Sequence, residues 1–205
     1  MPFAAQHIKA ARLHLQKHDP VMKRIIKQVG PFTAKTSRDR FLTLVRSIVS
    51  QQISVAAART ILQRLKTLVE PEGIKPDTLK NYSIDELREA GVSRQKAGYI
   101  LDLASKVADG TVNLKAMGRM KNADAIAELT QVKGIGVWTA QMFLMFALGR
   151  MDIFPTDDLG LQNAIKKAYE IKEELKKQKM EQIAESWGPH ATVASWYLWQ
   201  SLEVE

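Results

Sequence analysis

The stretch VKGIGVWTA, residues 132–140, places two glycines in a short gap between two segments whose apolar spacing is helical. Glycine costs roughly 1 kcal/mol in a helix interior, so Gly134 and Gly136 predict a tight turn that separates two helices. The first N–H groups of the second helix have no partner within that helix. They offer a site for an anion, which can approach a glycine backbone closely because no Cβ lies in the way. A simple helix cap at Gly134 before a short turn is the alternative interpretation.

Apolar residues recur every three or four positions along most of the chain, which is typical of amphipathic helices. Residues 41–69 show this spacing and predict two helices that meet near residues 51–54, with Ser54 as the cap of the second helix. Further helices are expected over 83–91, with a capping box of Ser83 and Glu86, and over 93–110, 122–132, 137–149, 159–170, 176–188 and 189–203. No segment alternates with a period of two for long enough to predict a sheet. We therefore expect an all-α protein of about ten to twelve short helices.

The composition is that of a globular protein with a basic surface. Hydrophobic residues make up 45% and charged residues 25% of the sequence, while 30 Lys and Arg against 22 Asp and Glu give a net charge of +8. This charge favours polyanionic partners, nucleic acid above all. The sequence has no run of 18 apolar residues and no signal peptide, so we expect a cytoplasmic, nucleoid-associated protein without a membrane partner.

Metal and cofactor chemistry is not expected. Cysteine is absent, which excludes disulfides, thiolate zinc sites, thiol catalysis and iron–sulfur clusters. His14 and His18 are four residues apart on a predicted helix, but no third ligand accompanies them, so we interpret them as part of a solvated face. The charged segment 172–182 is expected to be an exposed helix or loop and not a DNA-binding patch. Phosphate contacts from Arg94 and Lys96 remain open at this point.

The segment LTQVKGIGVWTA (129–140) resembles the helix-hairpin-helix of DNA repair proteins, which binds the phosphate backbone without reading bases. About 20 residues later, DIFPTDDLGLQNAI (152–165) places a proline and two acids just before a helix. Together they resemble the helix-hairpin-helix (HhH-GPD) DNA glycosylase superfamily. Segments 41–58, 87–104 and 184–199 are similar to its 3-methyladenine DNA glycosylase II branch.

The resemblance implies a two-lobed, all-α glycosylase unit over residues 1–205. The middle helices, about 40–150, would form the lobe that carries the hairpin at 132–138, and the N- and C-terminal helices would form the second lobe. The hairpin and Asp158 would lie at the cleft of the two lobes. The N-terminal β-rich subdomain of some members is expected to be absent, because only about 20 residues precede DPVMKRII.

The resemblance also implies the site residues. Asp158 takes the catalytic position, as an ionised carboxylate that stabilises the oxocarbenium ion, and Asp157 is expected to cap the following helix. The implied residues that bind the flipped base are Trp138, Met142, Trp199 and Gln51. Gln52 is expected to fill the gap in the DNA, with Gln51 as the alternative wedge. The implied contacts to DNA phosphates come from Lys133, Gly134, Ile135, Gly136 and Thr139, while Trp187 and Trp196 are assigned to the core.

The implied activity is monofunctional hydrolysis of the N-glycosidic bond of alkylated purines in double-stranded DNA, by a monomer without a cofactor. Bifunctional members of the superfamily carry a lysine nucleophile two residues after the second glycine, where this chain has Trp138. We therefore expect no strand-nicking activity. Two alternatives remain: a non-catalytic helix-hairpin-helix module that binds DNA, and a glycosylase for another damaged base.

Overall fold

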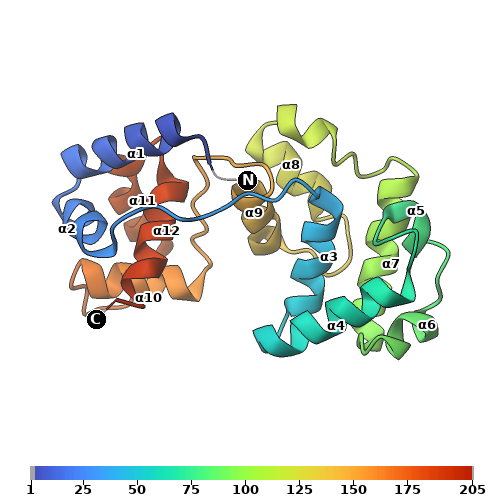
Figure 1. Cartoon of the computed structure of the whole chain (residues 1–205). Helices are drawn as coiled ribbons and strands as arrows, with labels where there is room; N and C mark the ends of the chain where they lie inside the picture. The colour runs from blue at the N-terminus through green and yellow to red at the C-terminus, as the bar shows by residue number, and fades with distance from the viewer. Residues whose placement is uncertain (1–2, 205) are drawn as a thin grey trace. The chain divides into compact units, whose positions relative to one another are not determined.

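The computed structural model describes residues 3–204, and these contain twelve α-helices, two short 3-10 helices and no β-strand (Figure 1). The all-α prediction is therefore confirmed. None of these helices combines the length and the apolar character that crossing a bilayer requires. The chain divides into two compact units, which we describe separately. The hairpin unit is Arg38–Phe143, and the terminal unit comprises the described residues up to Ser37 and those from Leu144 onward.

The hairpin unit is built around one central helix, α7 (Arg94–Ala108), which packs against α3, α5 and α6 and buries Ala97, Ile100, Leu103 and Ala104. The other elements of this unit are α3 (Arg40–Ser50), α4 (Val55–Leu68), α5 (Pro76–Leu79), α6 (Ile84–Glu89), the 3-10 helix η1 (Ala116–Arg119), α8 (Asn122–Leu129) and the greater part of α9 (Val137–Phe146).

Side-chain caps begin the helices of this unit where the sequence predicts them. Ser54 and Ser93 accept hydrogen bonds from backbone N–H groups in the first turns of α4 and α7. Ser83 and Glu86 form the predicted capping box at α6. Because these caps fix where α4 starts, the link between α3 and α4 is limited to residues 51–54, which we call the α3–α4 turn.

The terminal unit packs its helices around α12 (Ala191–Ser201), in which every residue from Ala191 to Leu198 is buried. Its other elements are α1 (Ala5–His18), α2 (Pro20–Val29), α10 (Leu159–Ala168), α11 (Lys177–Ala184) and the 3-10 helix η2 (Glu185–Trp187). Trp187 and Trp196 lie in this core, as predicted.

A buried carboxylate that the sequence analysis did not identify joins three parts of the terminal unit. Asp19 is 5% exposed, and its Oδ1 accepts the N–H groups of Val21 and Met22 at the start of α2. Its Oδ2 accepts the Tyr169 hydroxyl at 2.5 Å and the Trp187 indole N–H at 2.8 Å. All its bonds come from donors of its own unit, so Asp19 is a structural residue.

Of the two histidines that the sequence assigns to a solvated face, His18 is exposed, as expected, whereas His14 is not. The His14 ring is part-buried, with Nε2 3.0 Å from the Ser186 carbonyl oxygen and its centroid 5.1 Å from that of His190. The reason is that η2 and the start of α12 pack against this side of α1. Among the described residues, no group of three potential ligands could hold a metal ion.

Candidate functional site

Asp158 stands at the N-terminus of α10, where two N–H groups orient its side chain. Its Oδ1 accepts the Leu161 backbone N–H at 2.6 Å, which makes Asp158 the N-cap of the helix, and the Trp199 indole Nε1–H at 2.9 Å. Trp199 is half-buried in the last helix, and its ring lies 6.3 Å from that of Phe146. A Cβ on Gly160 would lie 3.2 Å from Asp158 Oδ1, so glycine leaves room for this arrangement. The carboxylate is held in one orientation by residues of its own unit.

The loop before Asp158 is tied to α12 by one buried threonine. Thr192 is fully buried, and its hydroxyl donates to the Arg150 carbonyl at 2.8 Å and accepts the Ile153 N–H at 3.0 Å. Its own N–H donates to the Met151 carbonyl. Because α12 is the centre of the terminal unit, these bonds fix the path of the chain toward Asp158. The sequence analysis did not identify Thr192, since a threonine in an apolar helix carries no distinct signal.

The hairpin, residues 130–136, links α8 to α9 and is supported from α7. Asp102 Oδ2 accepts the Lys133 N–H at 2.9 Å and the Lys106 ammonium at 2.7 Å. Burial would raise the pKa of Asp102, but the bonds from Lys106 and the Lys133 N–H outweigh it, so the pKa is lowered. Lys106 also donates to the Gln131 carbonyl. The hairpin is thus held from one side, and α9 begins directly after it with its first N–H groups outside the helical bonding pattern.

The two glycines of the hairpin serve different physical needs. Gly134 has φ +80°, and a Cβ there would lie 2.0 Å from Cδ2 of the Tyr99 ring. Gly136 has no positive φ, and nothing lies within 4 Å of the position of its Cβ. Gly134 is therefore required by the fold, whereas Gly136 leaves the backbone open at the surface.

The α3–α4 turn is anchored at its first residue and exposed at its second. The Gln51 side chain donates from Nε2 to the Gly134 carbonyl at 2.9 Å, and the Lys96 ammonium donates to the carbonyls of Val49 and Gln51 at 2.8 and 2.5 Å. Partial burial lowers the pKa of Lys96. Gln52 is exposed and has φ +56°, a left-handed conformation that few residues other than glycine adopt.

A cavity of about 730 Å³ lies where the turn, α7, the hairpin and α9 meet. Its lining includes Gln51, Gln52, Lys96, Tyr99, Trp138 and Met142. The Trp138 side chain is 44% exposed, which is unusual for the largest apolar side chain. Three of the four residues that were assigned to base binding from the sequence thus line one cavity, and the fourth, Trp199, belongs to the other unit.

The structure corrects one assignment of the sequence analysis and adds detail to two others. Asp158, and not the exposed Asp157, caps α10, because the helix begins at Leu159 and the cap accepts from the residue three positions on. The side chains of Ile135 and Thr139 are buried, at 3% and 5% exposure, so any contact from these positions to DNA must come from the backbone.

The structure also shows the contacts of Arg94 and Lys96, whose role the sequence left open. Arg94 pairs with Asp85 at 3.5 Å, and the Lys96 ammonium is bound by two carbonyls of the α3–α4 junction. The Lys96 ammonium is thus bound within the protein, whereas the Arg94 side chain is 70% exposed. A signal for the role of α7 does exist in the sequence, because Lys96, Tyr99 and Asp102 recur every three residues and mark a polar face of that helix.

The sequence profile of the HhH-GPD superfamily, described as base excision DNA repair proteins, matches residues 45–190. The chain belongs to the HhH-GPD superfamily. DNA-3-methyladenine glycosylase 1 of Schizosaccharomyces pombe is 31% identical over 93% of this chain and 86% of its own length. YfjP of Bacillus subtilis is 34% identical over 78% of this chain, which spans only 58% of that protein.

A solved HhH-GPD structure supports the same relationship. The S. pombe 3-methyladenine DNA glycosylase Mag1, in complex with abasic DNA, matches with a TM-score of 0.82 and 30% identity, over 95% of this chain and 97% of that chain. The matched region of the family profile includes the α3–α4 turn, the hairpin and Asp158.

Proposed function

We propose that this protein is a monofunctional DNA glycosylase that removes alkylated purines from double-stranded DNA and leaves an abasic site. The observation that carries the proposal is the orientation of Asp158 by the Leu161 N–H and the Trp199 indole. A carboxylate fixed in this way can stabilise a positive charge that develops on a sugar without rearranging during the reaction. The similarity to DNA-3-methyladenine glycosylase 1 of S. pombe supports the substrate class.

A single carboxylate is sufficient for this chemistry. A purine alkylated on a ring nitrogen is cationic, so it leaves with the electron pair of its C1′–N bond and becomes neutral without general acid catalysis. The sugar is left as an oxocarbenium ion, which Asp158 stabilises. Water adds to C1′ and loses its proton to the carboxylate or to solvent. The exposed Trp138 indole offers a π face to an electron-poor, cationic base.

Asp158→Asn is the decisive variant, and Asp157→Asn is its matched control. Asparagine is as good an N-cap as aspartate, so the first variant keeps the fold and loses only the charge. We expect base release from duplexes that contain 7-methylguanine or 3-methyladenine to fall on the order of 100-fold or more for Asp158→Asn. The neighbouring Asp157→Asn should release base at the wild-type rate.

Binding to an abasic-site duplex, measured in parallel, should be retained in Asp158→Asn. Full activity of this variant would contradict the catalytic assignment. A wild-type protein that binds the duplex but releases no damaged base would favour the non-catalytic binding module.

We assign Gln52 as the residue that fills the gap left by the flipped nucleotide. Gln52 is exposed at the turn, while its neighbour Gln51 is tied to the hairpin. Its amide can pair with the orphaned base, which an alkyl side chain cannot do. Gln52→Ala should slow excision from fully paired duplex more than from mismatched or single-stranded DNA, since unpairing is most costly in the paired substrate. Equal losses on the three substrates would instead assign Gln52 to the fold.

The proposed activity needs a single protein chain that binds double-stranded DNA. Backbone N–H groups after Gly136 and surface cations bind phosphates, so affinity for undamaged duplex should fall steeply with salt. We propose that the protein acts as a monomer on nucleoid DNA.

A further inference from the structure

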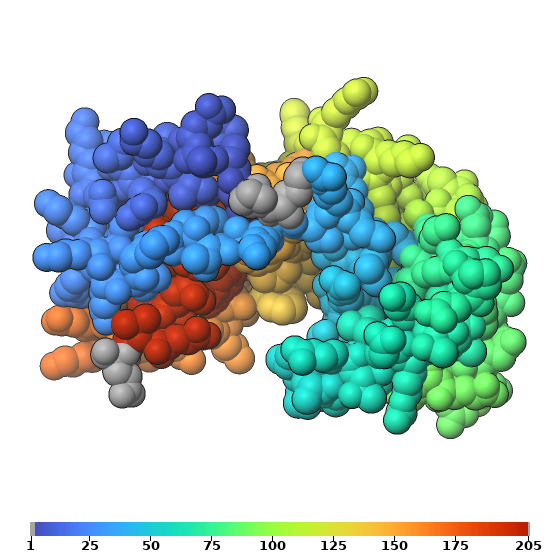
Figure 2. Space-filling model, in the orientation of Figure 1, coloured from blue at the N-terminus to red at the C-terminus, as the bar shows by residue number. Residues whose placement is uncertain are grey.

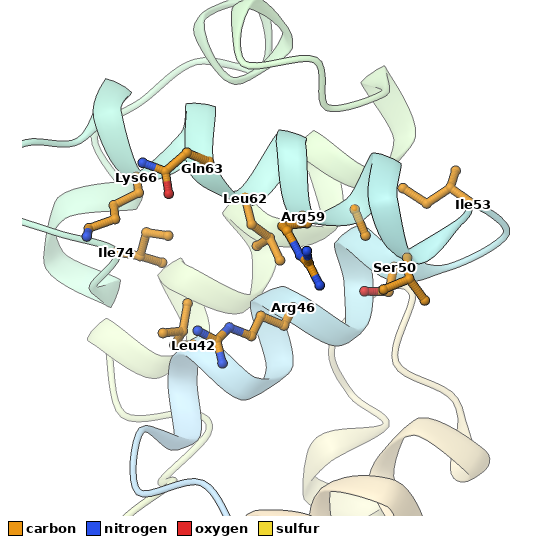
Figure 3. A pocket seen from close by; sticks show the side chains of 11 residues that line it. Leu42, Arg46, Ser50, Ile53, Arg59, Leu62, Gln63, Lys66 and Ile74 are labelled. Carbon is orange, nitrogen blue, oxygen red and sulfur yellow. The ribbon is translucent and has the colours of Figure 1, made fainter.

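A second cavity lies between α3 and α4, and we call it the α3–α4 groove (Figure 3). It has a volume of about 510 Å³. Leu42, Leu62 and Ile74 supply apolar lining, and Arg46, Arg59 and Lys66 supply three positive charges. Its lining contains no acidic residue. In Figure 2 the side chains of α4, in blue-green, form the lower edge of the hairpin unit, where they are open to solvent.

The three cations of the groove are not neutralised by the protein. Figure 3 shows Arg46 reaching from α3 and Arg59 from α4 into the space between the two helices, with Lys66 farther along α4. Within residues 3–204 none of these side chains takes part in a hydrogen bond or an ion pair. Three like charges in one concave site raise the local positive potential and attract a polyanion.

The spacing of the cations on α4 fits a nucleic acid backbone. Arg59 and Lys66 are seven residues apart, which places them on one face and about 10 Å apart along the helix axis. Three nucleotides of one DNA strand advance about 10 Å along the duplex axis. The two side chains can therefore follow one strand.

The groove opens at the turn that we propose enters the duplex. Ile53 and Val55 line this end and are 38% and 78% exposed, although both are apolar. Arg46 and Ser50 line both the groove and the cavity that contains Trp138. The end of α3 thus separates an aromatic cavity from a cationic groove, with the wedge residue Gln52 between them.

From this arrangement we propose that the α3–α4 groove binds the sugar-phosphate backbone of the DNA strand complementary to the lesion. Arg46, Arg59 and Lys66 contact its phosphates, and Ile53 and Val55 pack against deoxyribose carbons beside the orphaned base. This assignment rests on the proposed function, because it takes Gln52 as the residue that separates the two strands. The groove then holds the partner strand in place while the damaged nucleotide leaves the stack.

The first experiment measures binding of the double variant Arg59→Gln, Lys66→Gln to a duplex with a tetrahydrofuran abasic analogue. Both side chains are exposed, so the fold should be kept, and an unchanged thermal midpoint checks this. Each lost phosphate contact reduces the slope of log K against log salt by about 0.9, so we expect a slope shallower by about 1.8. Lys179→Gln removes an exposed charge from α11 and serves as the control, with an unchanged slope.

The second experiment assigns the strand. Neutral methylphosphonates replace phosphates near the abasic analogue on one strand at a time. Neutral linkages in the complementary strand should weaken binding of the wild type, and they should cause a smaller loss in the double variant, in which only Arg46 of the three cations remains. Neutral linkages in the lesion strand should weaken both proteins equally.

Failure of this inference and failure of the proposed function can be told apart, because neither measurement needs base release. An unchanged salt slope in the double variant overturns the groove assignment. The assignment also fails if the double variant loses its sensitivity to neutral linkages in the lesion strand and not in the complementary strand. An acidic protein partner would then be the remaining occupant of the groove. If no alkylated base is released by the wild type but the strand dependence is found, the groove stands and the glycosylase activity falls.

Discussion

Alanine substitutions at the two hairpin glycines should affect different properties: Gly134→Ala should reduce stability, and Gly136→Ala should reduce DNA binding. In Gly134→Ala the new Cβ would lie 2.0 Å from Tyr99 Cδ2, on a backbone with φ +80°. A left-handed alanine costs roughly 1–2 kcal/mol, and the displacement of a packed ring adds about 1–3 kcal/mol. We therefore expect Gly134→Ala to lower the free energy of unfolding by about 2–5 kcal/mol. Gly136→Ala meets nothing within 4 Å, so its change should stay within about 0.5 kcal/mol.

Urea unfolding of both variants, followed by titration with undamaged duplex at one salt concentration, tests this prediction. Gly136→Ala should keep its stability and lose affinity for DNA, because its methyl group occupies the surface where a phosphate approaches the main chain. If Gly134→Ala is as stable as Gly136→Ala, the packing argument fails. If Gly136→Ala binds duplex as tightly as the wild type, phosphates do not approach the backbone at this glycine.

Three further predictions concern single side chains. Trp199→Phe keeps a ring but removes the N–H that donates to Asp158, the carboxylate that we propose is catalytic, and this hydrogen bond is worth about 1–2 kcal/mol at a half-buried site. Single-turnover base release should therefore slow roughly 5–30-fold with unchanged duplex affinity, and a loss of affinity alone would contradict this. Lys96→Met frees the α3–α4 turn from two carbonyl contacts, so excision should fall more on fully paired than on mismatched duplex, and equal losses would speak against this role. Burial and the nearby His14 lower the pKa of His190 in the folded protein, so below about pH 6.5 the unfolded state binds more protons than the folded state and the free energy of unfolding decreases as the pH falls. Urea unfolding between pH 7 and pH 5 should show a smaller decrease of this free energy in His190→Gln than in the wild type. An identical pH dependence in the two proteins would refute the argument.

Local signals made much of the fold predictable. Ser54, Ser83 and Ser93 cap helices because a serine hydroxyl reaches an N–H two or three residues ahead, and this relation is visible in any sequence. Gly134 was predicted from its cost in a helix, and its positive φ agrees with that reasoning. The apolar period identified helices such as α3 and α7, because each of them buries one stripe of side chains, whereas α12 is buried on all sides from Ala191 to Leu198.

The contacts that support the candidate site could not be predicted in this way. Gln51 bonds to a carbonyl 83 positions away, and Lys96 bonds to carbonyls 45 and 47 positions away, so no local pattern encodes these pairs. The choice between Asp157 and Asp158 as the cap also failed, because a shift of one residue in the helix start exchanges their roles. Even so, the two residues were correctly placed at the start of a helix.

Gln51 and Gln52 are chemically identical neighbours, yet one is tied to the hairpin and the other is presented to solvent in a left-handed conformation. The shape of the turn is therefore settled when the protein folds, and the conformational entropy of that turn is not lost again at each encounter with DNA. A repair protein examines a great many intact base pairs for each damaged one. With Gln52 as the preformed wedge that we propose, the time spent at each base pair would be set by how readily the DNA itself opens, so that intact sequence is passed quickly and a weakened pair detains the protein.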